Sequence, residues 1–126
     1  MLVVIIDEDQ YLLKSLEIIL GQAGHIVETF HSAEAAVEWF ERRPEVDVLV
    51  VDYQLKYTTA VELLERLKDR FYCGCRVILV SGYTEVVEHL DLGRMGVDAF
   101  LPKPLDLEQL LVQTSSRAGV RVSGGR

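Results

Sequence analysis

The sequence predicts an α/β protein, a three-layer sandwich in which helices cover both faces of one parallel sheet. Two observations carry this prediction. Five apolar segments rich in β-branched residues alternate along the chain with five amphipathic segments. Three of the apolar segments, LVVII, VLVV and VILV, contain no polar residue. Such continuity is expected of strands that are covered on both faces.

The five strand candidates are short and are separated by segments long enough for a helix. They span Leu2–Ile6, His25–Phe30, Val46–Val51, Arg76–Ser81 and Val97–Leu101. A strand–helix alternation repeated five times, with right-handed crossovers, gives a doubly wound (βα)5 sheet. For five strands we expect the flavodoxin-like strand order 2-1-3-4-5.

Apolar spacing and capping residues define the first two helices. The first has one apolar stripe, formed by Leu12, Leu16, Ile19, Leu20 and Ala23. Asp9 is placed to cap the start of this helix, and Gly24 is suited to ending it. Ser32 is placed to cap a second helix, which Pro44 ends.

Three further helices follow the same logic. The third has the stripe Val61, Leu64, Leu67 and Phe71, and the fifth has Leu107, Leu110, Leu111 and Thr114. Thr84 is placed to cap a fourth helix running to about Arg94, and Asp106 to cap the fifth. From residue 115 the chain is rich in Ser, Gly and Arg and loses periodicity. We therefore expect one domain over residues 1–114 and a flexible tail or linker stub over residues 115–126.

Composition excludes several classes of protein. The chain has 126 residues and a formal net charge of −7, which argues against direct nucleic-acid binding by this domain. No apolar run approaches the ~18 residues that a membrane span needs. The apolar start lacks a basic region before it, so a cytoplasmic protein is expected. Cys73 and Cys75 are too close to join distant segments, and no zinc set accompanies them, so both are interpreted as reduced cysteines.

Polar residues of matching chemistry follow four of the predicted strands. They are Asp7 and Glu8, Asp52, Ser81 and Lys103. The carboxyl ends of parallel strands meet at one edge of the sheet, where ligands bind. Carboxylates gathered there repel one another unless a cation separates them, and an all-oxygen site suits Mg²⁺. A lysine and a serine hydroxyl can bind a phosphoryl group, and a carboxylate can act as its nucleophile.

Four segments, VVIIDED, VLVVD, VILVSGY and FLPKP, resemble in order and spacing the receiver domains of two-component response regulators. The resemblance covers roughly Met1 to Gln113. It implies that Asp52 accepts a phosphoryl group from a histidine kinase or phosphotransfer protein. It also implies that Mg²⁺ is held by Asp7, Glu8, Asp52 and the backbone carbonyl of Gln54.

The same resemblance assigns roles around the phosphoryl group and at the surface. It implies that Ser81 and Lys103 bind the phosphoryl group, and that Phe100 is an aromatic switch that turns inward. Phe100 could also be a plain core residue. The bond between Lys103 and Pro104 is expected to be cis. The face made of the fourth helix, fifth strand and fifth helix is expected to contact a second copy or an output partner. The domain is then a switch and not a turnover enzyme.

The chain departs from the family pattern after the acceptor aspartate. Receivers commonly have Pro and Gly in this loop, whereas the segment Leu55–Ala60 has neither. We expect a reshaped, mobile loop, with Ala60 unfavourable if its backbone needs a positive φ. Gln54 and Tyr83 stand where family members vary, and the resemblance suggests that they tune the access of hydrolytic water. A bulky Tyr83 is expected to slow that water.

Other functions fit the sequence less well. Asp52 alone could be a helix cap or a turn residue. A haloacid-dehalogenase-type phosphatase would need a second aspartate two residues after the first, where this chain has Gln54. A nucleotide-binding protein would need a glycine-rich phosphate loop, and none is present. The alternative left open is a pseudo-receiver that binds partners without phosphorylation.

Overall fold

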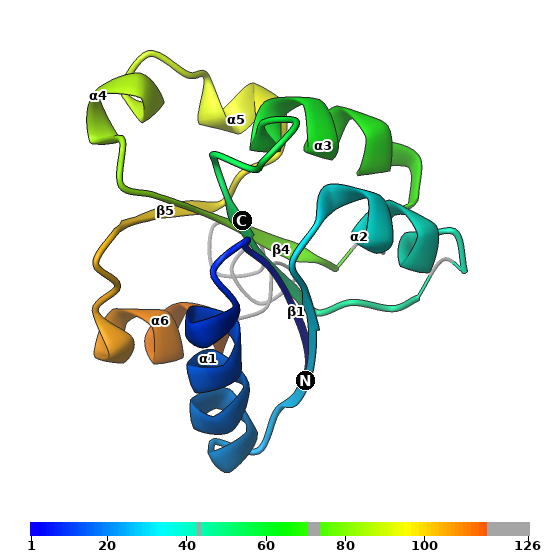
Figure 1. Ribbon diagram of the computed structural model, residues 1–126, viewed down its shortest axis with the longest axis vertical. Coiled ribbons are helices and arrows are strands. Elements are labelled where there is room, and N and C mark those ends of the chain that lie inside the picture. Colours follow the sequence, from blue (N-terminus) through cyan, green and yellow to red (C-terminus); the bar gives the residue numbers. More distant parts are fainter. Residues whose placement is uncertain (43, 71–73, 116–126) are drawn as a thin grey trace, which may run out of the picture.

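The sheet has the predicted topology. The computed structural model describes residues 1–42, 44–70 and 74–115 (Figure 1). Within them, five parallel strands pair in the order β2-β1-β3-β4-β5, which confirms the flavodoxin-like arrangement. The strands are β1 (Leu2–Ile6), β2 (Ile26–Phe30), β3 (Val48–Asp52), β4 (Arg76–Ser81) and β5 (Ala99–Pro102).

Helices cover both faces of this sheet. They are α1 (Gln10–Gln22), α2 (Ala33–Phe40), α3 (Ala60–Leu67), α4 (Thr84–Val87), α5 (Leu92–Met95) and α6 (Leu107–Thr114), with a 3₁₀ turn η1 (Lys68–Arg70) after α3. Figure 1 shows α1 and α6 on one face and the other helices on the opposite face. The structure is therefore the three-layer sandwich that the sequence predicts.

The core consists of two apolar clusters, one on each face of the sheet. Val3 and Ile5 of β1 pack into the cluster that contains the buried side of α1 and Leu110 of α6. Val4 and Ile6 pack into the cluster on the side of α2 and α3. Successive side chains of a strand point to opposite faces, so both sets must be apolar. This is why β1 shows no alternation of polar and apolar residues.

Local capping fixes where the longer helices begin and end. The carboxylate of Asp9 accepts a hydrogen bond from the N–H of Leu12 at 3.1 Å, and Ser32 Oγ accepts one from Ala35 at 3.2 Å. Asp106 accepts from two N–H groups at the start of α6. Gly24 follows the cap of α1 with φ +97°, a conformation that favours glycine. All four of these sequence-based predictions are confirmed.

The prediction of one continuous helix from Thr84 to about Arg94 is wrong. The segment forms two four-residue helices, α4 and α5, and Thr84 is the first residue of α4 rather than its cap. The carboxylate of Asp91 accepts a hydrogen bond from the N–H of Arg94 at 3.3 Å and so starts a new helix. An aspartate that bonds to the nearby backbone competes with helix continuation, and Gly93 adds little helix propensity.

Several boundaries differ from the predictions. β2, β3 and β5 begin one or two residues later than expected, and β3 extends through Asp52. The third helix ends at Leu67 and continues as η1, while Phe71 and Cys73 lie outside the described residues. Leu107 remains 44% exposed, so it does not belong to the buried side of α6. Residues 116–126 of the predicted tail also lie outside the described part.

Two further expectations concern the loop after β3 and the membrane. Ala60 is fully buried and is the first residue of α3, so its backbone is helical and needs no positive φ. The missing glycine therefore carries no strain at this position. No helix within the described residues is long and apolar enough to cross a membrane.

Two glycines around the end of α1 should respond oppositely to the same substitution. We expect Gly24→Ala to lower the free energy of unfolding by about 1 kcal/mol, because its φ of +97° is costly for alanine. Gly21→Ala should raise it by about 0.5–1 kcal/mol, because Gly21 is helical and open space surrounds its Cβ position. Urea unfolding of both variants checks the pair, and equal signs would contradict the assignment.

Candidate functional site

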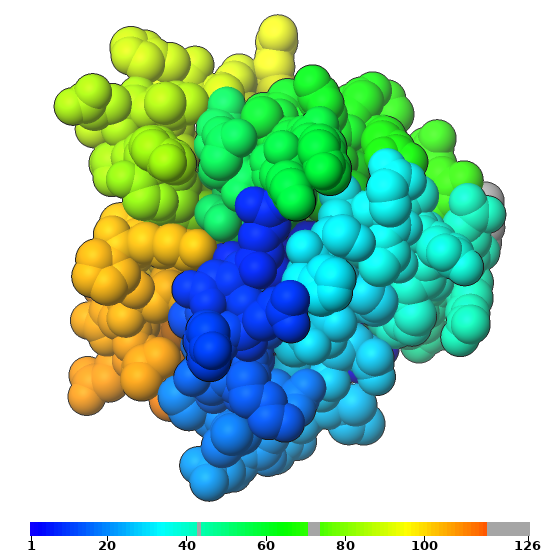
Figure 2. All heavy atoms as spheres, in the orientation of Figure 1, coloured from blue at the N-terminus to red at the C-terminus, as the bar shows by residue number. Residues whose placement is uncertain are grey.

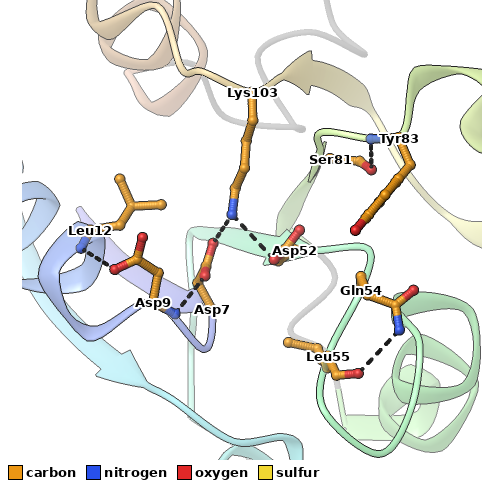
Figure 3. A network of polar contacts seen from close by, with 9 residues as sticks. All are labelled: Asp7, Asp9, Leu12, Asp52, Gln54, Leu55, Ser81, Tyr83 and Lys103. Atoms are coloured by element: carbon orange, nitrogen blue, oxygen red, sulfur yellow. Dashed lines mark hydrogen bonds and ion pairs between the residues drawn. The ribbon is translucent and has the colours of Figure 1, made fainter.

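Four strand ends bring the predicted site residues to one edge of the sheet (Figure 3). In the space-filling view, the blue segment that follows β1 lies between the green segment after β3 and the orange segment after β5 (Figure 2). Asp7 follows β1, Asp52 is the last residue of β3, and Ser81 is the last residue of β4. Parallel pairing fixes the register, since Asp52 lies opposite Val80 and Ser81 lies opposite Pro102. The N–H of Lys103 then donates to the carbonyl oxygen of Ser81 at 2.9 Å. The sheet itself therefore sets the relative positions of these groups.

The ammonium group of Lys103 joins the two aspartates. Lys103 Nζ lies 2.7 Å from Asp7 Oδ2 and 3.2 Å from Asp52 Oδ2. The Asp7 side chain is buried, and its second oxygen accepts a hydrogen bond from the N–H of Asp9 at 2.9 Å. The Asp52 side chain is 12% exposed, so part of it remains open to solvent. One lysine is thus held in direct contact with both aspartates.

These contacts change the ionisation of both groups. Burial raises the pKa of Asp52, and the negative charge of Asp7 raises it further. Lys103 and a hydrogen bond from the Gln54 N–H oppose that shift without cancelling it. For Lys103, burial by itself lowers the pKa, but the hydrogen bond and charge of Asp7, followed by those of Asp52, raise it overall. The surroundings therefore favour the neutral form of Asp52 and the charged form of Lys103.

Ser81 and Tyr83 lie on the other side of Asp52. Ser81 is fully buried, and its Oγ accepts a hydrogen bond from the N–H of Tyr83 at 2.8 Å. A serine hydroxyl can donate at the same time as it accepts. Tyr83 is 58% exposed, and Figure 3 shows its hydroxyl directed toward Asp52 and Gln54. An exposed tyrosine ring thus lies next to the site.

The remaining predicted residues lie around this centre. Glu8 is exposed at the rim, and it takes no part in the contacts of Lys103. Among the described residues, no three Asp, Glu, His or Cys side chains converge closely enough to hold a metal. Phe100 is half-buried against the cluster on the α2–α5 face. The Lys103–Pro104 bond is cis, as the sequence resemblance implies.

Two supporting groups in this site were not assigned a role from the sequence. The Asp9 N–H orients Asp7, and the Tyr83 N–H orients the hydroxyl of Ser81. Both are backbone N–H groups, which nearly every residue type has, so the residue types at these positions do not predict the contacts. Each lies two residues beyond the group that it contacts, and this spacing is the one signal that could have indicated them.

The fold and the site define a class before any relative is considered. A doubly wound sheet with two aspartates, a serine and a lysine at its carboxyl edge is a flavodoxin-like α/β protein with a polar site at the strand ends. The family model of the response regulator receiver domain matches residues 3–115. The chain belongs to this family, whose members are signalling modules of two-component systems.

Individual relatives agree with this assignment. The TorCAD operon transcriptional regulatory protein TorR of Escherichia coli is 26% identical over 114 residues, which are 90% of this chain and 48% of that protein. A CheY-like receiver domain protein from Methanospirillum hungatei has a TM-score of 0.80 and 27% identity, with 90% of each chain covered. The chain spans about half the length of the curated relatives that it matches first.

A third relative shows the same fold at lower identity. It is the response regulator TrrA of Thermotoga maritima, whose structure is a complex with Mg²⁺ and BeF. The TM-score is 0.76 at 17% identity, with 90% of this chain and 96% of that one covered.

The raised pKa of Asp52 predicts how this carboxyl group affects stability. Because the fold favours its neutral form, Asp52→Asn should raise the free energy of unfolding at pH 7 by roughly 1 kcal/mol. The gain should shrink as the pH falls through the folded-state pKa, because the wild-type carboxyl group then becomes neutral too. Urea unfolding between neutral and acidic pH measures both effects.

A matched control comes from the same edge of the sheet. Asp106 is an exposed helix cap, and asparagine caps a helix about as well as aspartate. Asp106→Asn should therefore stay within about 0.5 kcal/mol of the wild type. A loss of stability in Asp52→Asn at neutral pH would show that Lys103 outweighs burial and Asp7.

Proposed function

We propose that this chain is a phosphorylation-dependent switch in which Asp52 accepts a phosphoryl group from a histidine kinase or phosphotransfer protein. The observation that carries the proposal is the close approach of Asp7, Asp52 and Lys103 at the carboxyl edge of the sheet. Buried carboxylates are costly unless cations offset them, and here a lysine supplies only part of that offset. Such a site is built to receive a further cation and an anionic group together.

The residues present fit Mg²⁺. Asp7 and Asp52 supply carboxylate oxygens, and the Gln54 carbonyl is the proposed third protein ligand. Mg²⁺ usually keeps several waters and binds through one or two carboxylates, so two aspartates and one carbonyl are enough protein ligands for it. Glu8, exposed at the rim, would then contact the ion through a bound water. The Mg²⁺ and BeF in the complex of TrrA support this assignment by analogy of fold.

The side chains have separate roles in the proposed phosphoryl transfer. An oxygen of Asp52 attacks phosphorus, and the bond from phosphorus to the donor breaks as the new bond forms. Bound Mg²⁺ would shield the negative charge of the phosphoryl oxygens. Lys103 Nζ, already 3.2 Å from Asp52, would turn from Asp7 to a phosphoryl oxygen. The Ser81 hydroxyl would donate a hydrogen bond to a second phosphoryl oxygen.

The output would follow from the movement of Ser81. Its Oγ accepts from the Tyr83 N–H, and the Tyr83 carbonyl accepts from the N–H groups of Val86 and Val87 in α4. A shift of Ser81 toward the phosphoryl group would therefore pull on the start of α4, while Phe100 turns inward. The proposed contact surface for a second copy or an output partner is α4, α5, β5 and α6, where Val86 is 41% exposed.

Phosphorylation by a small donor gives the direct test of function. After incubation with acetyl phosphate and Mg²⁺, intact-protein mass spectrometry should show a gain of one phosphoryl group in the wild type. Asp52→Ala should show none, and omission of Mg²⁺ should abolish the gain. No gain with acetyl phosphate or with any phosphorylated donor protein would favour the pseudo-receiver. A gain in Asp52→Ala would move the acceptor to another residue.

The position of Tyr83 predicts the lifetime of the phosphorylated form. Because its hydroxyl end points toward Asp52, Tyr83→Ala should admit water and speed hydrolysis several-fold. The loss of phosphoryl mass with time, after removal of the donor, measures this rate. Ile18→Ala is the control, because Ile18 is 50% exposed and lies in the second half of α1, away from the strand ends that form the site. Equal lifetimes of the three proteins would remove this role from Tyr83.

A further inference from the structure

β2 is an edge strand whose outward main-chain groups have no partner. It lies at one end of the sheet, beside β1 alone. The Ile26 N–H and the Phe30 carbonyl oxygen form hydrogen bonds on the β1 side, at 2.9 and 3.1 Å. Main-chain direction alternates along a strand, so the N–H and C=O groups of Val27 and Thr29 point away from the sheet. Within the described part of the chain, no hydrogen bond reaches these four groups.

The edge formed by β2 lacks the features that commonly block an exposed strand. Proteins often place proline or lysine on such an edge. β2 has the sequence IVETF, with neither residue, and its one charged side chain is Glu28. The opposite edge strand, β5, ends at Pro102, which has no N–H to donate. β2 is therefore the edge that can accept a further strand.

The side chains of β2 leave apolar surface uncovered on the face of the sheet that α2 packs against. Ile26 is 68% exposed. Phe30 lies on the same face, where its ring centroid is 5.4 Å from that of Trp39, and both rings are half-buried. A strand added beside β2 would cover Ile26 and extend this aromatic pair.

The residue pattern of β2 identifies a second copy of β2 as the strand that fits. The pattern is the same in either direction: apolar Ile26, β-branched Val27, Glu28, β-branched Thr29 and apolar Phe30. Pairing about a two-fold axis at Glu28 places Ile26 opposite Phe30 of the second copy. It also places Val27 opposite Thr29 of that copy, and all five residues are paired.

This register also satisfies the open main-chain groups. Val27 and Thr29 of the two copies form hydrogen-bonded pairs, because all four groups point outward. Ile26 and Phe30 form non-hydrogen-bonded pairs, in which the side chains lie closer together, and aromatic–β-branched pairs stabilise a sheet. The unfavourable contact is between the two Glu28 carboxylates, since like charges directly opposite each other are destabilising.

We propose that β2 pairs antiparallel with β2 of a second copy, so that two five-stranded sheets join into one. The contact lies at the edge of the sheet opposite to β5, and it requires no phosphoryl group. A single strand pair buries little surface, so the dimer is weak and forms at high protein concentration.

Sedimentation equilibrium of the unphosphorylated chain over a wide range of concentration tests the contact. The wild type should show a monomer–dimer equilibrium. Thr29→Pro should raise the dissociation constant at least about tenfold, because each copy loses an intermolecular hydrogen bond. The lost N–H bonds to nothing within the sheet, so circular dichroism should show a retained fold. Val86→Lys is the control, since Val86 is also exposed but lies in α4, and its dissociation constant should stay within about twofold of the wild type.

The two Glu28 carboxylates give a test of the register with an exposed residue. Glu28→Gln should lower the dissociation constant about two- to fivefold, because it removes the like-charge pair. Glu28→Lys alone should stay close to the wild type, since it replaces one like-charge pair with another. An equal mixture of wild type and Glu28→Lys should form a heterodimer tighter than either homodimer.

The outcomes assign the contact or remove it. A wild type that remains monomeric up to its solubility limit would overturn the proposal. A dimer that survives Thr29→Pro, or that Val86→Lys abolishes, would place the contact on another surface and overturn it too. Loss of the dimer in Thr29→Pro, together with a tighter mixed dimer, would establish the β2 contact and its register.

Discussion

The placement of the Lys103 ammonium group between Asp7 and Asp52 is the interaction on which the site depends. Two carboxylates at adjacent strand ends repel each other, and burial makes their charges costlier. Lys103 reduces that cost through contacts of 2.7 and 3.2 Å. It can do so only because β5 lies beside β4, which places the lysine beyond Ser81. The strand order is thus a requirement of the charge arrangement.

The sequence predicted the sheet and most of the helix ends because local chemistry decides them. Continuous apolar runs can be satisfied only by strands covered on two faces, and Asp9 and Ser32 satisfy backbone groups three residues away. The prediction of one continuous fourth helix was wrong for a related reason. From the sequence, Asp91 could lie on the polar face of one long helix or cap a second helix. Only the packing around Asp91 determines which of the two forms.

The sequence predicted which residues form the site better than it predicted how their side chains are arranged. Strand ends alone indicated that Asp7, Asp52, Ser81 and Lys103 would meet. Their pairing was not predictable, because it depends on where a flexible lysine settles among several acids. Glu8 illustrates the same limit, since it follows Asp7 in the chain but projects to the exposed rim. Gln54 and Thr59 form an antiparallel bridge whose flanking main-chain hydrogen bonds depend on no particular residue type, so the sequence does not indicate it.

The division of the fourth helical segment has a consequence for the local stability of this stretch. A helix of four residues has no cooperative stability of its own, because isolated helices shorter than ~12–15 residues are marginal in water. Residues 84–95 are therefore held by side-chain packing through Val87 and by the link from Tyr83 to Ser81. A modest free-energy change at the site can therefore alter the conformation of residues 84–95 while the sheet beneath them stays folded. The stretch between β4 and β5 thus depends on its neighbours for its stability more than the longer helices do.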